Sequence, residues 1–192
     1  MRILGLLVAS AALTIGAALA VVRSGVLDVA ASSPHSATVR WLLSTTMERS
    51  VKRRAADHAP PPSLADPARI EAGFAAYEDM CAVCHGSPRA EASVIARGLN
   101  PEAPRLDEVV DRWSDAELFW IVENGVRMTG MPAFGATHED GELWDLVAFV
   151  GRLPSSSQSE YRELREARAQ KSRQGHSNRP GEAAPRSDHL HR

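Results

Sequence analysis

The longest apolar stretch of the chain lies at its N-terminus. Residues 3–22 form a run of twenty residues without a charge, and Arg2 and Arg23 bound it. A helix needs about twenty such residues to cross the hydrocarbon core of a bilayer. Residues 1–23 are therefore predicted to form a single transmembrane anchor. A cleaved signal peptide stays open as an alternative, because Ala18–Ala20 resembles a small-x-small cleavage site.

A second helical pattern covers residues 33–58, within the segment 24–62 that joins the anchor to the compact domain. Ser33 and Pro34 form a helix start signal, and the basic residues gather toward the end of the pattern. Its apolar residues recur near helical spacing on one face: Val39, Leu42, Leu43, Met47 and Val51. The pattern predicts an amphipathic helix that lies either on the neighbouring domain or on lipid headgroups. The prolines at 60–62 predict a stiff linker and a domain boundary.

Residues 63–154 are predicted to form the compact domain, and each of its periodic runs is helical. Asp66 and Pro67 begin the first helix, which leads to the cysteines. Residues 114–117 read as a capping box before a second helix, and a third helix ends before Pro154. No strand-like alternation is present. The predicted fold is all-α, with three to four helices after the N-terminal one.

The near-neutral total charge of −2 hides a strongly acidic domain between basic flanks. Residues 63–154 carry 7 arginines against 16 acidic residues, whereas residues 1–62 and residues 155–192 are both net basic. An acidic face favours docking of basic protein partners and argues against a nucleic-acid binder. Residues 155–192 are predicted to be a charged tail, disordered from Ser172 onward, although residues 161–171 could form a charged helix.

The chemistry of the chain centres on a C-x-x-C-H motif formed by Cys81, Cys84 and His85, which contains both cysteines of the chain. This spacing is that of a c-type haem attachment site. Two thiols on one helical turn can bond the two vinyl groups of one haem, which leaves the adjacent imidazole beneath the iron. A zinc site would need two further ligands, and a redox dithiol would sit beside a βαβ pattern. The motif therefore predicts one covalently bound haem c.

A haem iron held by one histidine has a second axial position, for which a thioether suits electron transfer. Met131 is the candidate, because Gly130 permits close backbone approach and Pro132 stiffens the loop. Met128 is the rival ligand. The remaining histidines are expected to be solvated or hydrogen-bonded: His35, His58, His138, His176, His189 and His191.

With these motifs, residues 66–154 resemble the class I (monohaem) cytochromes c of the bacterial membrane-anchored type. Gly73 and Tyr77 stand eight and four residues before Cys81, as in the first helix of that family. Leu146 and Phe149 resemble the residues of the last helix that cross it. The resemblance implies a cytochrome c-like fold in which the glycine lets the two helices pack closely.

The resemblance also assigns roles within the site. It implies that Cys81 and Cys84 form the thioether bonds, that His85 is the proximal iron ligand and that Met131 is the distal one. It further implies that the carbonyl of Pro104 accepts a hydrogen bond from the His85 ring, which would orient the imidazole.

The function implied is one-electron transfer between periplasmic or membrane redox partners with basic docking surfaces. The protein is then an electron carrier rather than an enzyme, held by one transmembrane helix in the bacterial cytoplasmic membrane with its haem domain in the periplasm. Two alternatives stay open. The chain could be the haem-bearing subunit of a dehydrogenase or oxidase complex. It could also be a peroxidase-like enzyme with an open sixth iron position, which requires Met131 to be absent from the iron.

Overall fold

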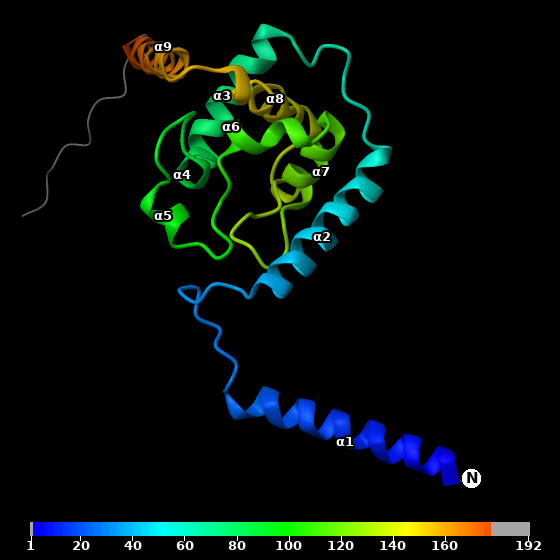
Figure 1. Cartoon of the computed structure of the whole chain (residues 1–192). Coiled ribbons are helices and arrows are strands. Elements are labelled where there is room, and N and C mark those ends of the chain that lie inside the picture. The colour runs from blue at the N-terminus through cyan, green and yellow to red at the C-terminus, as the bar shows by residue number, and fades with distance from the viewer. Residues whose placement is uncertain (1, 178–192) are drawn as a thin grey trace, which may run out of the picture.

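The regular elements of the protein are all helical over residues 2–177, the part of the chain that the computed structural model describes (Figure 1). The α-helices are α1 (Arg2–Ser24), α2 (Ala37–Arg54), α3 (Pro67–Met80), α4 (Ala82–His85), α5 (Val94–Arg97), α6 (Leu106–Val109), α7 (Asp115–Asn124), α8 (Asp140–Val150) and α9 (Gln158–Ser177). Short 3₁₀ turns are η1 (Ala55–Asp57), η2 (Val110–Arg112), η3 (Phe134–Ala136) and η4 (Leu153–Ser155). The all-α fold class predicted from the sequence is confirmed.

Helix α1 stands apart from the rest of the molecule, at the end of an extended connection (Figure 1). It is long and apolar enough to cross a membrane, and none of its residues is buried. The connection is tied to the domain at one point, where the Asn100 side-chain amide donates a hydrogen bond to the Ser33 carbonyl at 2.8 Å. The N-terminal helix is thus compatible with a single-pass anchor.

Helix α2 begins three residues later than Ser33 and Pro34 predict. Its N-cap is Ser36, whose hydroxyl accepts a hydrogen bond from the Val39 N–H. The Ser33 hydroxyl is engaged elsewhere, because it donates to the carboxylate of Asp28. Ser33 therefore stabilises a turn in the connection between α1 and α2 instead of capping α2.

The apolar stripe expected on α2 is only partly buried. Val51 is fully buried, together with Ala55 of η1, where α2 meets α7. Leu42, which belongs to the same predicted stripe, is 55% exposed. After η1, the His58 ring packs on Phe119 of α7 with the ring centroids 5.0 Å apart. One end of α2 is thereby fixed to the domain.

Helices α3 and α8 form the central pair, and Gly73 lies where they meet. A Cβ atom at this glycine would be 1.9 Å from the carbonyl oxygen of Asp145, so only glycine allows the approach. Phe149 of α8 packs on Phe74 and on Tyr77, each at a centroid distance of 5.3 Å. The close crossing that the sequence predicts between these two helices is confirmed.

Helix α7 completes the core beside α8. Ser114 and Glu117 form the predicted capping box, with reciprocal hydrogen bonds to each other's backbone N–H groups. Phe119 then stacks on Trp144 of α8 at 4.3 Å. The chain leaves α7 at Gly125, whose φ of +63° is in the left-handed region that glycine adopts readily.

The segment after the domain forms helix α9, which packs on α3. Tyr161 is only 3% exposed, and its hydroxyl donates to the carboxylate of Glu78. Arg165 donates two hydrogen bonds to the same carboxylate, both at 2.8 Å. The sequence predicts disorder from Ser172 onward, whereas the structure continues α9 to Ser177, and residues 178–192 lie outside the described part.

Candidate functional site

The three residues of the C-x-x-C-H motif lie on a single helical turn. Cys81 caps the C-terminus of α3, where its N–H donates to the Tyr77 carbonyl at 2.8 Å. The Cys81 carbonyl then accepts from the N–H groups of Cys84 and His85, at 3.0 and 2.9 Å. Gly86 ends the turn with a φ of +71°. The two thiols and the imidazole therefore stand on one short, hydrogen-bonded backbone segment.

The imidazole of His85 is held in one orientation and one tautomer. Its Nδ1 lies 2.8 Å from the carbonyl oxygen of Pro104. A carbonyl can only accept, so Nδ1 carries the proton and Nε2 keeps its lone pair. Burial lowers the pKa of His85 and so favours the neutral imidazole, and it outweighs the hydrogen bond to Pro104, which acts in the opposite direction. The structure thus contains the His85–Pro104 contact that the family resemblance predicts, and a neutral ring nitrogen is a metal ligand.

Two further residues, Tyr77 and Asp107, brace the segments that carry His85 and Pro104. The buried hydroxyl of Tyr77 donates to the carbonyl of Gly86 at 2.6 Å, and burial raises its pKa. Asp107 accepts from the Arg89 N–H at 2.9 Å and from the Arg105 guanidinium at 2.8 Å. These contacts position the loop that carries Pro104.

The sequence alone indicates neither of these roles. In the sequence, Tyr77 is part of the first-helix pattern, and Asp107 is one of many acidic residues. Burial opposes the charge on Asp107, but the hydrogen bonds from Arg105 and Arg89 outweigh it and lower the pKa of this carboxyl. An acidic residue eighteen positions from its backbone partner leaves no local pattern by which it could be found.

Cys81 and Cys84 form no disulfide, and each side chain is partly buried. Burial, together with the neighbouring Cys84, raises the pKa of Cys81 to about 12. The reactive form of a cysteine in disulfide exchange is the thiolate, which such a pKa suppresses at neutral pH. The microenvironment of Cys81 therefore does not resemble that of a redox-active dithiol.

Met131 lies in the loop between α7 and α8, half-buried against the hydrophobic core. Two hydrogen bonds hold the backbone of Met131 in place: the Met131 N–H donates to the Thr129 hydroxyl, and the Met131 carbonyl accepts from the Val126 N–H. Met128, the rival candidate, is 76% exposed and has a φ of +62°. Of the two methionines, only Met131 reaches the core of the domain.

The structure brings Met131 and Cys81 to the same apolar cluster, which α3, α7 and α8 build and to which Trp113 and Phe134 also pack. The donor set fits a haem. Two thiols stand one helical turn apart, a neutral imidazole has its tautomer fixed, and a thioether lies against the same core. The residues that could hold the group are Cys81, Cys84, His85 and Met131.

Two of the remaining histidines have structural partners. His58 packs on Phe119 and lies 3.7 Å from the carboxylate of Glu123. His138 follows the methionine loop, and its Nδ1 lies 2.9 Å from the Thr137 hydroxyl. The side chain of His176 and all of His189 and His191 lie outside the described residues.

Comparison with known proteins places the site within a recognised domain. Residues 68–150 match the family model described as "Cytochrome C oxidase, cbb3-type, subunit III". The match covers less than half of the chain, from the start of α3 to the end of α8, and includes the C-x-x-C-H motif and Met131. A search of curated proteins finds no match to the chain.

Proposed function

We propose that the protein is a membrane-anchored one-electron carrier, because residues 68–150 match a cytochrome c family model, which implies haem-based electron transfer. It holds one haem c through thioether bonds to Cys81 and Cys84. His85 and Met131 are its axial ligands. With both axial positions filled, no substrate binds the metal, and the protein acts as a carrier instead of an enzyme.

The observation that supports this proposal best is the hydrogen bond between the His85 ring and the Pro104 carbonyl. It fixes the proton on Nδ1 and leaves Nε2 as the ligand atom, on the same turn that presents both thiols. A hydrogen bond of this kind orients a metal-bound imidazole and raises its donor strength. When bound, haem supplies an iron that cycles between the ferrous and ferric states.

Hydrogen bonds within the chain brace the segments that carry the proposed ligands. Tyr77 and Asp107 fix the segments that carry His85 and Pro104. The loop hydrogen bonds at Thr129 and Val126 fix the backbone of Met131. Small rearrangement between redox states favours fast electron exchange, so this bracing serves the function directly.

The organisation of the chain supports a location at a membrane. We propose that residues 1–23 are the anchor, residues 24–62 the amphipathic helix with its linker, residues 63–154 the haem domain and residues 155–192 the charged tail. The anchor crosses the bacterial cytoplasmic membrane once, with the haem domain in the periplasm. The domain has 16 acidic residues against 7 arginines, which attracts basic partners, and its reactions should be faster at low ionic strength.

A second candidate function is that of a subunit in a larger oxidase or dehydrogenase complex. The description of the matching family model, subunit III of a cbb3-type oxidase, favours it. Mild detergent extraction distinguishes the two functions. A carrier elutes as a single polypeptide, whereas a subunit elutes with constant partners.

The test of haem attachment is expression of the full chain with a haem c maturation system. The protein should keep its pigment on a denaturing gel, and the double variant Cys81→Ala/Cys84→Ala should lose it. A wild-type polypeptide that is colourless after acid–acetone extraction would refute covalent attachment.

The test of the distal ligand compares two methionine variants. Met131→Ala should keep the haem, lose the long-wavelength methionine–iron band and lower the reduction potential by on the order of 100 mV, within the roughly 0.8 V range that axial ligands span. Met128→Ala is the control and should change neither property. The reverse result would assign the ligand to Met128, and no change in either variant would exclude methionine ligation.

A further inference from the structure

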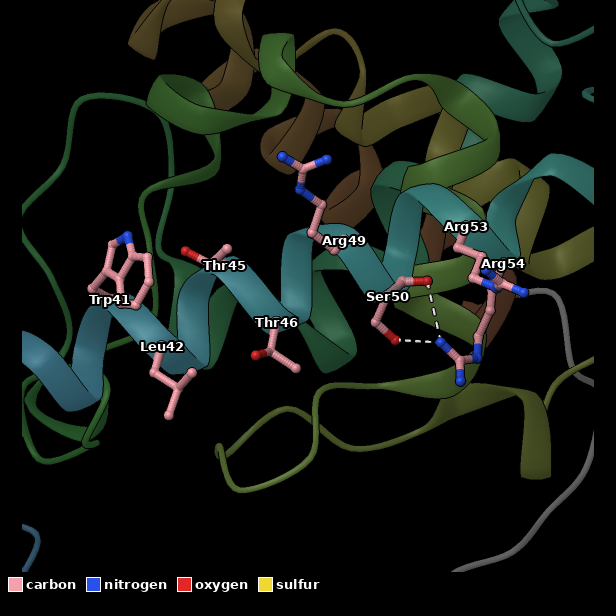
Figure 2. A pocket seen from close by; sticks show the side chains of 8 residues that line it. All are labelled: Trp41, Leu42, Thr45, Thr46, Arg49, Ser50, Arg53 and Arg54. Atoms are coloured by element: carbon pink, nitrogen blue, oxygen red, sulfur yellow. Dashed lines mark hydrogen bonds between the residues drawn. The ribbon is translucent and has the colours of Figure 1, made fainter.

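The side of α2 that faces away from the domain carries both apolar and basic side chains. Figure 2 shows them around a shallow depression along the helix, with Trp41 and Leu42 toward its N-terminal end and Arg49 and Arg53 farther along. Trp41 is 65% exposed and Leu42 is 55% exposed. Leu42, Arg49 and Arg53 are close to whole helical turns apart and therefore share one side of α2. We call this side the outward face.

The opposite side of α2 fixes the direction in which the outward face points. Val51 and Ala55 are buried against the domain, and His58 packs on Phe119 directly after the helix. Because these contacts prevent rotation of α2 about its own axis, the apolar residues of the outward face cannot become buried against the domain. Its exposed tryptophan and leucine therefore need another explanation.

The charge of α2 contrasts with that of the domain on which it packs. Glu48 is its one acidic residue and is paired with Lys52 at 2.6 Å. The basic residues of α2 are Arg40, Arg49, Lys52, Arg53 and Arg54. Residues 63–154, in contrast, carry 16 acidic residues against 7 arginines. An anionic surface thus attracts α2 and repels the rest of the domain, which orients the molecule with the outward face toward that surface.

The position of α2 in the chain brings it close to a bilayer. It follows the candidate membrane helix α1 after only residues 25–36, and Asn100 holds that connection at Ser33. The apolar end of the outward face, at Trp41, is the end nearer to α1. Tryptophan is enriched at membrane–water interfaces, and basic residues on an interfacial helix attract anionic lipids.

We propose that the outward face of α2 lies on the membrane surface and binds anionic phospholipid headgroups. Trp41 and Leu42 enter the boundary between headgroups and acyl chains. Arg49 and Arg53 pair with lipid phosphates, and Lys52, which is paired with Glu48, adds to the positive potential beside them. Lipid is favoured over the acidic domain of a second copy because α1 keeps α2 beside the bilayer at every protein concentration. The proposal rests on α1 being retained in the membrane, which flotation of the full chain with lipid vesicles tests separately.

The experiment uses the full, haem-loaded chain in lipid vesicles, with a nitroxide label on Thr46→Cys. Thr46 lies on the outward face between Leu42 and Arg49 and is exposed. In vesicles that contain phosphatidylglycerol, the label should become accessible to oxygen and protected from a water-soluble nickel relaxant. A label on Glu163→Cys of α9 is the matched control and should stay accessible to nickel. Wild-type protein treated in the same way gives the background of labelling.

The charge dependence is tested with two variants of equal net charge. Each basic residue near an anionic surface strengthens binding about fivefold. The variant Arg49→Gln/Lys52→Gln/Arg53→Gln should therefore lower the equilibrium constant for binding of α2 to the lipid surface about 100-fold. The control variant Arg97→Gln/Arg152→Gln/Arg162→Gln changes exposed arginines outside α2 and should leave protection unchanged.

Three results would overturn the proposal. The label at residue 46 could stay accessible to nickel in anionic vesicles, or its protection could survive the triple α2 variant. Protection that grows with the protein-to-lipid ratio and brings spin–spin broadening would instead assign the outward face to a second copy of the chain. Each result is independent of haem binding, which the visible spectrum of the same sample reports.

Discussion

Replacement of Gly73 by alanine tests how closely α3 and α8 must approach for the domain to be stable. The new Cβ would lie 1.9 Å from the carbonyl oxygen of Asp145 and 2.9 Å from the Cβ of Phe149. Real Cβ atoms essentially never have contacts under 3.0 Å, so the nearer atom must move by about 1.1 Å. That atom belongs to the backbone of α8 and cannot rotate away. The two helices must therefore separate.

The expected loss of stability combines two opposing contributions. Overpacking of a well-packed core costs about 1–3 kcal/mol, and the rigid backbone obstacle puts Gly73→Ala at the upper end. Alanine in a helix interior recovers about 1 kcal/mol relative to glycine. The net change in the free energy of unfolding is a loss of about 2 kcal/mol, or about 10 °C in Tm for a domain of this size. Separation also draws Phe149 away from Tyr77, which helps to hold the His85 segment.

The assay is guanidinium unfolding of the haem-loaded chain in detergent, followed by tryptophan fluorescence. All four tryptophans lie outside α1, so the signal reports the domain and α2 rather than the membrane helix. Gly141→Ala is the matched control, because a Cβ at this position of α8 has nothing within 4 Å. It should be neutral or stabilising by up to about 1 kcal/mol. Equal unfolding midpoints for the two variants would refute the close-approach argument.

Two further predictions concern α9 and α7. Burial opposes the charge on Glu78, but the hydrogen bonds from Arg165 and Tyr161 outweigh it and hold its pKa below the ordinary 4.5. The resulting stability is present above pH 4.5 and is lost as the pH falls through the lowered value, so the difference in urea midpoint between wild type and Glu78→Gln should be present at pH 7 and should disappear once the pH is below the lowered pKa of Glu78. A difference that is constant with pH would exclude the charged contact as its source. Ser114→Ala removes half of the α7 capping box and should lower the free energy of unfolding by about 1 kcal/mol in the same titration, whereas an unchanged midpoint would show that the cap contributes nothing.

The parts of the fold that the sequence predicts well are those fixed by local chemistry. The Ser114 capping box and the turn that carries Cys81, Cys84 and His85 depend on residues within a few positions of each other, so a pattern is enough to find them. The crossing of α3 and α8 is a long-range feature, but it has a local sign in Gly73, whose lack of a side chain permits the contact.

The parts that escaped prediction depend on partners distant in the sequence. Helix α9 has too few apolar residues to suggest docking, yet one buried tyrosine, Tyr161, inserts among aromatic rings of α3 and α8. Basic residues of α9 also form ion pairs with acidic residues of α3, such as Lys171 with Glu71 at 2.8 Å. These distant contacts of α9 form only once the chain has folded. The start of α2 differs from the prediction for a local reason, because Ser33 donates to the carboxylate of Asp28 five residues earlier and Ser36 caps the helix instead.

The hydrogen bond between Asn100 and Ser33 determines how far the domain can travel from its anchor. It leaves residues 25–32 between α1 and the point of attachment, and the turn at Asp28–Ser33 keeps their span below the fully extended reach of about 27 Å. With α1 in a bilayer as proposed, the acidic domain stays within a thin layer above the lipid. It then meets a membrane-embedded partner by diffusion in two dimensions. A tether this short keeps the effective concentration of such a partner in the millimolar regime once the two anchors are neighbours. The rate of electron transfer between such partners would then depend on lateral diffusion in the membrane and only weakly on the volume of the periplasm.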